Sequence, residues 1–420
     1  MSRVDKSNKG FLVICGMFPV IDVLNGLFLS LNYSFPIGIL YRFYFFLFLL
    51  VGILRKGLKK TRLTVYTALV LVFVLSTLLL QTVYFNYPLS IIIADGSVLI
   101  KCLFWSLIPY YVYQRKETIG PRLSPLLIGL NVQFVLGLLV PYILGVGNFT
   151  YENSQAGYKG FFFATNDVTF AFIILSFFSG WYLVSQFGKM HTLAKVSLGL
   201  LYSMNVFCFL IIGTKTGLVF CCLLTVYVLV QLLFLMNEVT GLEKMVIIMM
   251  LLIVFLFFLW HGQEFIEEKL AGVINRLTFF YYHYNRDLVR LLTSSRSTYL
   301  KEATTLFFNN KSWLFAFFFG FGVEQRLLMF GRYGLVEMDF FDTFFSLGAV
   351  NLFIISVAFL FYNRLNRQRK NNIFGHLFLI SLTYSFFVGH VLYSALSSTL
   401  FGLICSGIIV DTSEQQDGAT

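Results

Sequence analysis

Residues 64–84 read TVYTALVLVFVLSTLLLQTVY, a stretch without a single charged side chain. A helix that crosses a hydrocarbon core of roughly 30 Å needs about 20 such residues. Comparable stretches recur along the 420-residue chain, which is 58% hydrophobic and 12% charged, whereas soluble domains carry about 25% charged residues. The sequence therefore predicts an all-α polytopic membrane protein and excludes a soluble globular one.

Interrupting the apolar stretches at charge clusters predicts about twelve transmembrane helices. Nine are expected near residues 11–30, 37–54, 64–84, 97–113, 125–146, 166–185, 196–212, 217–236 and 246–260. Three more are expected near residues 344–362, 374–389 and 393–410. The first follows a basic tail and shows no clear cleavage site, so we expect a retained signal anchor.

Lysine and arginine lie mostly on one side of these predicted helices. With the N-terminus inside, the inner segments hold eighteen of them, whereas the short outer loops hold only Lys159 and Lys215. The positive-inside rule then predicts that both termini are cytoplasmic. The formal net charge of +11 follows from this topology, and no nucleic-acid partner is expected.

One long hydrophilic segment, residues 261–343, is expected as an extracytoplasmic loop. Its 83 residues carry nine basic and nine acidic side chains interleaved with aromatic ones. Amphipathic helices are predicted over 264–292 and 297–308, and residues 313–323 are apolar but too short to span. Because polar groups concentrate here, we expect this loop to carry the function. The predicted organisation comprises helices one to nine (1–260), the loop (261–343), helices ten to twelve (344–410) and a disordered tail (411–420).

Two cations are candidates for binding an anion. Lys215 occupies the tip of a predicted helical hairpin, within Gly-Thr-Lys-Thr-Gly at 213–217; the alternative is a lysine that reaches lipid phosphates. Arg296 precedes a predicted helix that Ser297 or Thr298 would cap, and helix amides beside an arginine form an anion site. The alternative for Arg296 is an ordinary surface charge.

Three carboxylates, Glu337, Asp339 and Asp342, stand where predicted helix ten begins. Asp339 and Asp342 are three residues apart and so share a helix face, with Glu337 off it. A partly desolvated carboxylate beside a cationic loop can act as a general base. Equally, carboxylates at a helix start complement the helix dipole.

Further candidates are weaker. Lys159 and Asn166 lie in an outer loop whose aromatic, amide and acid groups suit sugar rings, although an interfacial aromatic belt explains its Phe run equally well. Arg276, Arg286 and Arg290 are expected on the first loop helix, where a face toward solvent or lipid headgroups is the favoured reading. No histidine pair has metal-ligand spacing, so neither a metal nor a cofactor is expected.

Together these elements resemble the O-antigen polymerase and ligase superfamily. The resemblance is carried by Gly-Phe-x-x-x-x-Asn at 160–166, the hairpin tip, the single large loop with Ser295-Arg296, Phe-Gly-Phe-Gly at 319–322, and the acidic motif before Gly348. The last two stretches are most similar to its capsular-polysaccharide polymerase branch. Lys215 stands where the family usually has arginine, and carboxylates stand where many ligases have histidine, which favours polymerase over ligase.

The resemblance implies a membrane glycosyltransferase with a GT-C-like fold at the outer face of the bacterial plasma membrane. Its substrates would be polyprenyl-diphosphate-linked oligosaccharide repeat units, joined by inverting transfer with release of polyprenyl diphosphate. Lys215 and Arg296 would then bind the diphosphate, and one of Glu337, Asp339 and Asp342 would be the base. Possible partners are membrane lipids, a flippase and a chain-length regulator. The alternatives are a ligase of the same superfamily, a flippase of lipid-linked oligosaccharides, and a scaffold without activity.

Overall fold

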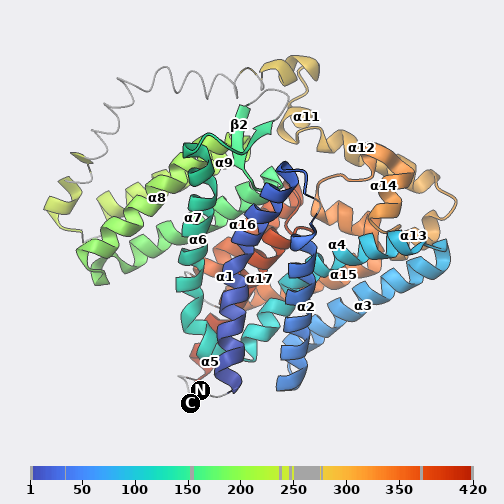
Figure 1. Cartoon of the computed structure of the whole chain (residues 1–420), viewed down its shortest axis with the longest axis horizontal. Helices are drawn as coiled ribbons and strands as arrows, with labels where there is room; N and C mark the ends of the chain where they lie inside the picture. The colour runs from blue at the N-terminus through green and yellow to red at the C-terminus, as the bar shows by residue number, and fades with distance from the viewer. Residues whose placement is uncertain are drawn as a thin grey trace. The chain divides into compact units, whose positions relative to one another are not determined.

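The computed structural model describes residues 3–33, 35–151, 156–235, 239–245, 248–249, 275, 278–368 and 372–417. Within these ranges the regular secondary structure is helical apart from one β-hairpin, β1 (Asn148–Tyr151) and β2 (Ala156–Gly160) (Figure 1). Nine described helical segments are long and apolar enough to cross a membrane. They coincide with predicted helices one to eight and ten, so the multi-pass membrane class is confirmed. Predicted helix nine, 246–260, falls almost entirely outside the described residues.

The helices of crossing length include continuations across short turns. Their bounds are α1 (Arg3–Ser30), α2 (Ile37–Lys56), α3 (Arg62–Phe85), α4 (Leu89–Tyr113), α5 (Lys116–Ile119) with η1 (Gly120–Arg122) and α6 (Leu123–Ile143), α7 (Thr165–Gln186) with η3 (Phe187–Lys189), α8 (Thr192–Ile212), α9 (Lys215–Val230) with a π-helical turn η4 (Gln231–Leu235), and α15 (Asp339–Arg367). Two shorter apolar helices, α16 (Ile373–Phe387) and α17 (Ala395–Asp417), match predicted helices eleven and twelve. The last continues past residue 410, where the sequence analysis ended it.

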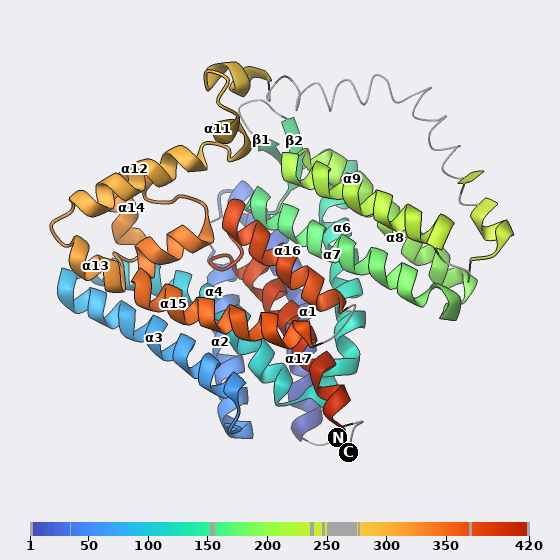
Figure 2. The same cartoon turned by 180° about the vertical axis from the view of Figure 1, so that it is seen from behind.

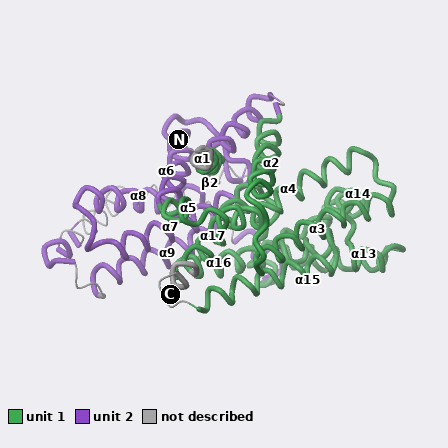
Figure 3. The backbone as a smooth tube through the Cα atoms, turned by 90° about the horizontal axis from the view of Figure 1, so that it is seen from below, with its two compact units in different colours: residues 1–18, 36–124, 287–420 green, residues 19–35, 125–286 purple. Residues whose placement is uncertain are grey.

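The chain forms two compact units (Figure 3). Unit 1 comprises residues 1–18, 36–124 and 287–420, and unit 2 comprises residues 19–35 and 125–286. In unit 1, α4 packs along α17, where the Trp105 amide donates to Ser398 Oγ at 3.1 Å. A Cβ on Gly402 would lie 3.0 Å from the Phe104 carbonyl oxygen. Small residues therefore allow these two helices to approach closely, as membrane helices commonly do.

From residue 287 onward, the long hydrophilic segment folds into short helices that share an apolar core with the start of α15. These are α11 (Leu288–Leu292), α12 (Arg296–Asn309), α13 (Trp313–Phe319), α14 (Glu324–Phe330) and η5 (Gly331–Tyr333). Figure 2 shows α12, α13 and α14 beside α15. Their core joins the loop helices to the start of α15 through Ala303, Phe307, Ala316, Phe321, Phe330, Val336, Met338 and Phe345. The loop is thus a packed layer of unit 1.

One predicted loop helix is wrong in its described part. Residues 264–292 do not form a single helix, because Asn285 and Arg286 adopt left-handed backbone conformations and Asp287 caps a new helix, accepting from the Arg290 amide at 3.0 Å. Arg286 and Arg290 therefore do not share a helix face. The second predicted loop helix is confirmed as α12, although it begins at Arg296 without a side-chain cap from Ser297 or Thr298.

Helix α15 is broken at Gly348, and the loop fills the break. Gly348 has φ +79°, and a Cβ there would lie 2.2 Å from the Phe318 carbonyl group. The amides of Phe321 and Gly322 donate to the carbonyl oxygens of Phe345 and Ser346 at 3.0 and 2.9 Å. Buried Gln81 of α3 donates to the Ser346 carbonyl oxygen as well, at 2.7 Å. The first two turns of α15 are therefore held by the loop and α3.

Unit 2 contains the predicted hairpin. Gly213, with φ +66°, ends α8, and Thr214 begins α9 by accepting from the Gly217 amide at 3.3 Å. Thr214 Oγ1 also lies 3.1 Å from Thr169 Oγ1 of α7. The hairpin predicted from the short turn at 213–217 is confirmed, and its tip is anchored near the start of α7.

Five of the six cysteines are buried, and Cys222 is exposed.

Candidate functional site

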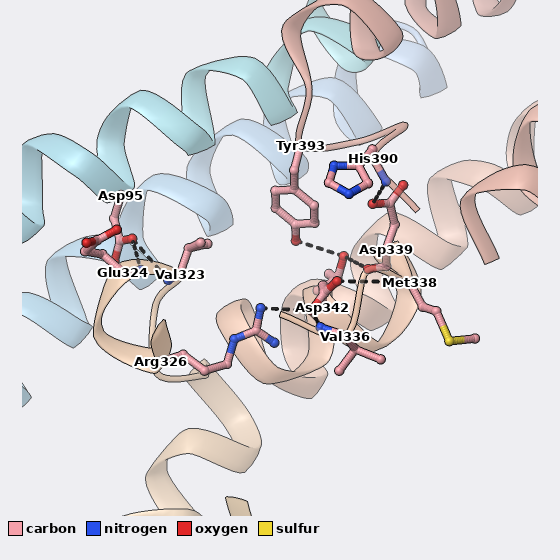
Figure 4. Close-up of polar contacts among 11 residues, drawn as sticks. Asp95, Val323, Glu324, Arg326, Val336, Met338, Asp339, Asp342, His390 and Tyr393 are labelled. Atoms are coloured by element: carbon pink, nitrogen blue, oxygen red, sulfur yellow. Dashed lines mark hydrogen bonds and ion pairs between the residues drawn. The ribbon is translucent and has the colours of Figure 1, made fainter. Parts of the chain in front are cut away.

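A cavity of about 170 Å³ lies in unit 1 at the N-terminal end of α15. Its polar lining consists of Arg326, Glu337, Asp339, Asp342, His390 and Tyr393. These residues come from α14, the start of α15 and the 388–394 loop between α16 and α17. Figure 4 shows Arg326 pointing toward Asp342, with Tyr393 and His390 above it near Asp339. The structure therefore brings all three predicted carboxylates to one cavity.

Asp339 organises the 388–394 loop. Its Oδ1 accepts from the His390 amide at 2.8 Å, and its Oδ2 accepts from the amides of Val391 and Leu392 at 2.7 and 3.0 Å. The Ser385 hydroxyl also donates to Oδ2, at 2.8 Å. Both oxygens of this buried carboxylate are thus engaged, and its role is to hold the loop.

Asp342 is similarly engaged by a buried arginine. Its Oδ1 accepts from Arg326 Nη2 at 2.9 Å and from the Val336 amide at 3.0 Å, and its Oδ2 accepts from the Met338 amide at 3.1 Å. Arg326 has no solvent exposure and Asp342 is 8% exposed at its side chain. This pair therefore fixes α14 and the 336–338 backbone against the start of α15.

Glu337 is the most exposed carboxylate of the three, with 43% of its side chain accessible. Its Oε2 accepts from Arg296 Nη2 at 2.9 Å, and that arginine is only 11% exposed. The sequence separates the two residues by 41 positions. Predicted base and predicted cation thus meet directly, and Glu337 remains partly exposed beside the cavity.

Left-handed backbone conformations gather at this site. Ser295, Glu337 and His390 have φ of +70°, +61° and +65°, which costs a residue with a Cβ of order 1 kcal/mol or more. A Cβ on Gly389 would lie 2.5 Å from the Glu337 carbonyl oxygen, so the loop packs on the Glu337 backbone. Such strain concentrates at functional sites, and here it flanks one cavity.

Three residues of the cavity, Arg326, His390 and Tyr393, were not predicted as site residues. Arg326 was one of nine similar basic residues in the loop, and no local pattern distinguishes it. Tyr393 donates to Thr343 Oγ1 at 2.8 Å, and burial, the largest influence, raises the pKa of its hydroxyl well above the usual range. It therefore remains a neutral hydroxyl across physiological pH.

The basic clusters of unit 1 lie at the opposite end of its helices. Arg115, which follows α4, donates to the Gly52 carbonyl oxygen at 2.7 Å, so the end of α4 adjoins the end of α2 with its Arg55 and Lys56. Rings of Tyr66 and Phe361, 4.9 Å apart, bring the start of α3 beside the C-terminal part of α15. The cavity is thus at the end of the bundle away from these positive charges.

The candidates of unit 2 gather at one end of that unit. Lys159 lies in β2, whose hairpin contacts the end of α8 because Thr150 Oγ1 donates to the Ile212 carbonyl oxygen at 2.9 Å. Asn166 lies in the first turn of α7, near the Thr169 contact that anchors the Lys215 tip. Of the loop arginines, Arg290 is on α11 in unit 1, and Arg276 lies outside the described residues.

Comparison with known proteins adds no assignment: the chain matches no protein-family model and no curated protein. Among the described residues, no group of three or more His, Cys, Asp and Glu side chains is arranged to hold a metal ion.

Proposed function

We propose that the protein is a polysaccharide polymerase that joins lipid-diphosphate-linked oligosaccharide repeat units at the outer face of the bacterial plasma membrane. The observation that carries the proposal is the contact of Glu337 with Arg296 at the open side of a cavity, in a chain with many membrane-spanning helices. A base beside a cation is what transfer from a diphosphate donor to a hydroxyl acceptor requires.

In the proposed reaction, a hydroxyl of one lipid-linked repeat unit attacks the anomeric carbon of a growing lipid-linked chain. Glu337 takes the hydroxyl proton as the new C–O bond forms. The bond between the anomeric carbon and the diphosphate oxygen breaks with inversion, and polyprenyl diphosphate leaves with the electron pair. Arg296, which contacts Glu337, stabilises the charge that develops on the leaving diphosphate.

Glu337 is favoured over the two aspartates because of how their oxygens are used. Asp339 and Asp342 accept hydrogen bonds on both oxygens from buried donors. Glu337 has one bonded oxygen and is partly exposed. A base needs a free oxygen within reach of a hydroxyl, and in the part of the chain that the structure describes, Glu337 is the one of the three with an oxygen that accepts no hydrogen bond.

The proposed orientation follows from the distribution of charge in unit 1. The cavity lies at the end away from Arg55, Lys56 and Arg115. The positive-inside rule assigns the basic end to the cytoplasm. This distribution supports a cavity at the outer face of the membrane and cytoplasmic termini, as predicted from the sequence.

The test is to incubate the purified chain with a lipid-diphosphate-linked repeat unit in the presence of EDTA and to resolve the products on a gel. We expect a ladder that survives chelation and that E337Q abolishes. Single transfer to a different acceptor would instead indicate a ligase. No transfer with a matched repeat unit would contradict the proposal.

A flippase is the second candidate, because broken helices are typical of transporters and α15 is broken at Gly348. In transporters the freed backbone groups coordinate substrate or ions. Here the carbonyl oxygens of Phe345 and Ser346 accept from the loop, and that of Leu347 accepts from Asn351 at 3.0 Å. The break is therefore used for packing, which favours the enzyme. Cells without a flippase would accumulate repeat units on the inside only, and cells without a polymerase would accumulate them outside.

A further inference from the structure

Resting on the proposed function, we propose that Arg326 and Tyr393 form the subsite that holds the acceptor sugar, a neutral pyranose ring, in the cavity beside Glu337. Three observations on unit 1 carry this inference: unused donors on a buried arginine, the balance of charge around it, and the size of the cavity.

Arg326 has more donors than the surrounding protein uses. It bonds Asp342 through Nη2, but no described residue accepts a hydrogen bond from its Nε or Nη1, although both atoms are fully buried. A buried donor without an acceptor is destabilising by about 1–3 kcal/mol in general, and guanidinium donors in folded proteins are usually satisfied. Arg326 lines the cavity, so a small shift of its guanidinium would bring these donors to a ligand oxygen placed there.

The charges around Arg326 favour a neutral ligand over an anion. Three carboxylates, Glu337, Asp339 and Asp342, line the same cavity. A diphosphate placed there would face these like charges, which is unfavourable. A sugar hydroxyl can bind both kinds of lining side chain, since it accepts a hydrogen bond from a guanidinium and donates one to a carboxylate. The cavity thus separates the acceptor from the diphosphate, which is assigned to Arg296.

The size of the cavity suits one ring. Its volume of about 170 Å³ is similar to the roughly 150 Å³ of a cavity that holds a benzene-sized ring. Glu337, with its side chain 43% exposed, lies toward solvent, and Arg326, fully buried, lies at the closed side. A pyranose that reaches Arg326 therefore presents its outer hydroxyl to Glu337, which is the hydroxyl that the proposed reaction deprotonates.

Binding is tested on the full chain in a detergent without a sugar headgroup, lauryldimethylamine oxide, so that nothing competes for the cavity. The neutral probes are the methyl glycosides of glucose, galactose, N-acetylglucosamine and rhamnose, whose binding is measured by saturation-transfer NMR. The anionic probe is inorganic pyrophosphate, whose binding is measured by the line width of its phosphorus NMR signal. We expect at least one glycoside to bind. R326K keeps a cation for Asp342 but loses the guanidinium fork, and should weaken glycoside binding by roughly tenfold or more, with pyrophosphate binding within twofold of the wild type.

The matched control is R332K. Arg332 is exposed, lies in η5 of the same segment, does not line the cavity, and donates to the Tyr333 hydroxyl at 2.6 Å, so glycoside binding should not change. Y393F leaves the buried ion pair intact and should weaken glycoside binding several-fold, which keeps the test available should R326K fold poorly.

Absence of binding by every glycoside, or equal binding by the wild type, R326K and Y393F, would overturn the subsite. So would pyrophosphate that competes with the glycoside and loses affinity in R326K, because the cavity would then be an anion site. The proposed function fails separately. If the wild type binds glycoside through Arg326 but makes no ladder, the sugar subsite stands and the polymerase activity is refuted.

Discussion

An amide cannot replace Asp342 without placing two donors face to face. Arg326 Nη2 and the Val336 amide donate to Oδ1, and the Met338 amide donates to Oδ2. An asparagine presents an NH2 group to one of these sides whichever way it turns. D342N also leaves Arg326 buried without a counter-charge, and removing one partner of a buried ion pair costs about 3–5 kcal/mol. We therefore expect D342N to destabilise the protein strongly.

The same comparison gives smaller costs for the other two carboxylates. D339N sets an NH2 group against either the His390 amide or the donors at Oδ2, and one unsatisfied buried donor costs about 1–3 kcal/mol. In E337Q the amide oxygen can still accept from Arg296, because only Oε2 is bonded. For a side chain 43% exposed, the loss in stability should be about 1 kcal/mol or less. Loss of a general base should nevertheless lower the rate by roughly 10²–10⁴.

The assay is heat denaturation of the detergent-purified variants, followed by tryptophan fluorescence, beside the ladder assay on the same samples. Extrapolating from smaller domains, ~1–2 °C per kcal/mol gives an apparent Tm lowered by roughly 3–10 °C for D342N and by about 2 °C or less for E337Q. Scan rates are matched because such transitions are commonly irreversible. A thermally normal D342N, or an E337Q that keeps its ladder, would refute the division of these carboxylates into structural and chemical groups.

Two further predictions follow from the same geometry, and a third tests the role that the sequence predicts for Lys215. G348A should lower heat stability and yield, because at φ +79° its Cβ would lie 2.2 Å from the Phe318 carbonyl group. The control G16A, whose Cβ would have nothing within 4 Å, should leave both unchanged. Equal melting temperatures for the two variants would contradict the requirement for glycine at the break in α15. R296Q should shorten the polymer and lower its yield at least tenfold while the apparent Tm stays within a few degrees of the wild type, and an unchanged ladder from verified protein would remove Arg296 from the site. K215Q should raise the KM for the lipid-linked donor, and K215R should match or improve on the wild type because arginine binds phosphate in a fork; identical kinetics for all three proteins would show that Lys215 does not contact the donor.

The helices and the hairpin tip were predictable because their signals are local. A continuous apolar stretch such as 64–84 needs no partner to be recognised, and Gly213 with Thr214 determines a turn within a few residues. The predicted helix over 264–292 failed for a local reason as well, since the left-handed Asn285 and Arg286 end it before Asp287 starts another. No periodicity reveals that two consecutive residues leave the helical region.

The partners of the candidate site could not be predicted, because they are distant in sequence. Asp339 bonds residues up to 53 positions away, and Arg296 reaches Glu337 across 41. From sequence, Glu337, Asp339 and Asp342 are three similar acids at a helix start. Only their hydrogen-bond partners distinguish them, and those partners depend on how the 388–394 loop and α14 pack against α15.

The break in α15 explains why the cavity can form at a helix start. A straight α15 would continue its hydrogen-bond ladder through residues 345–348, leaving the 320–322 backbone without the acceptors that it uses at Phe345 and Ser346. Because Gly348 interrupts the ladder, the segment from Asp339 to Leu347 pairs with the loop that carries Arg326. The carboxylates of α15 and the cations of the loop are therefore held in one layer by backbone bonds. The site thus depends on glycines at 320, 322 and 348 as much as on its charged residues, because a Cβ at any of them would meet protein within 2.3 Å.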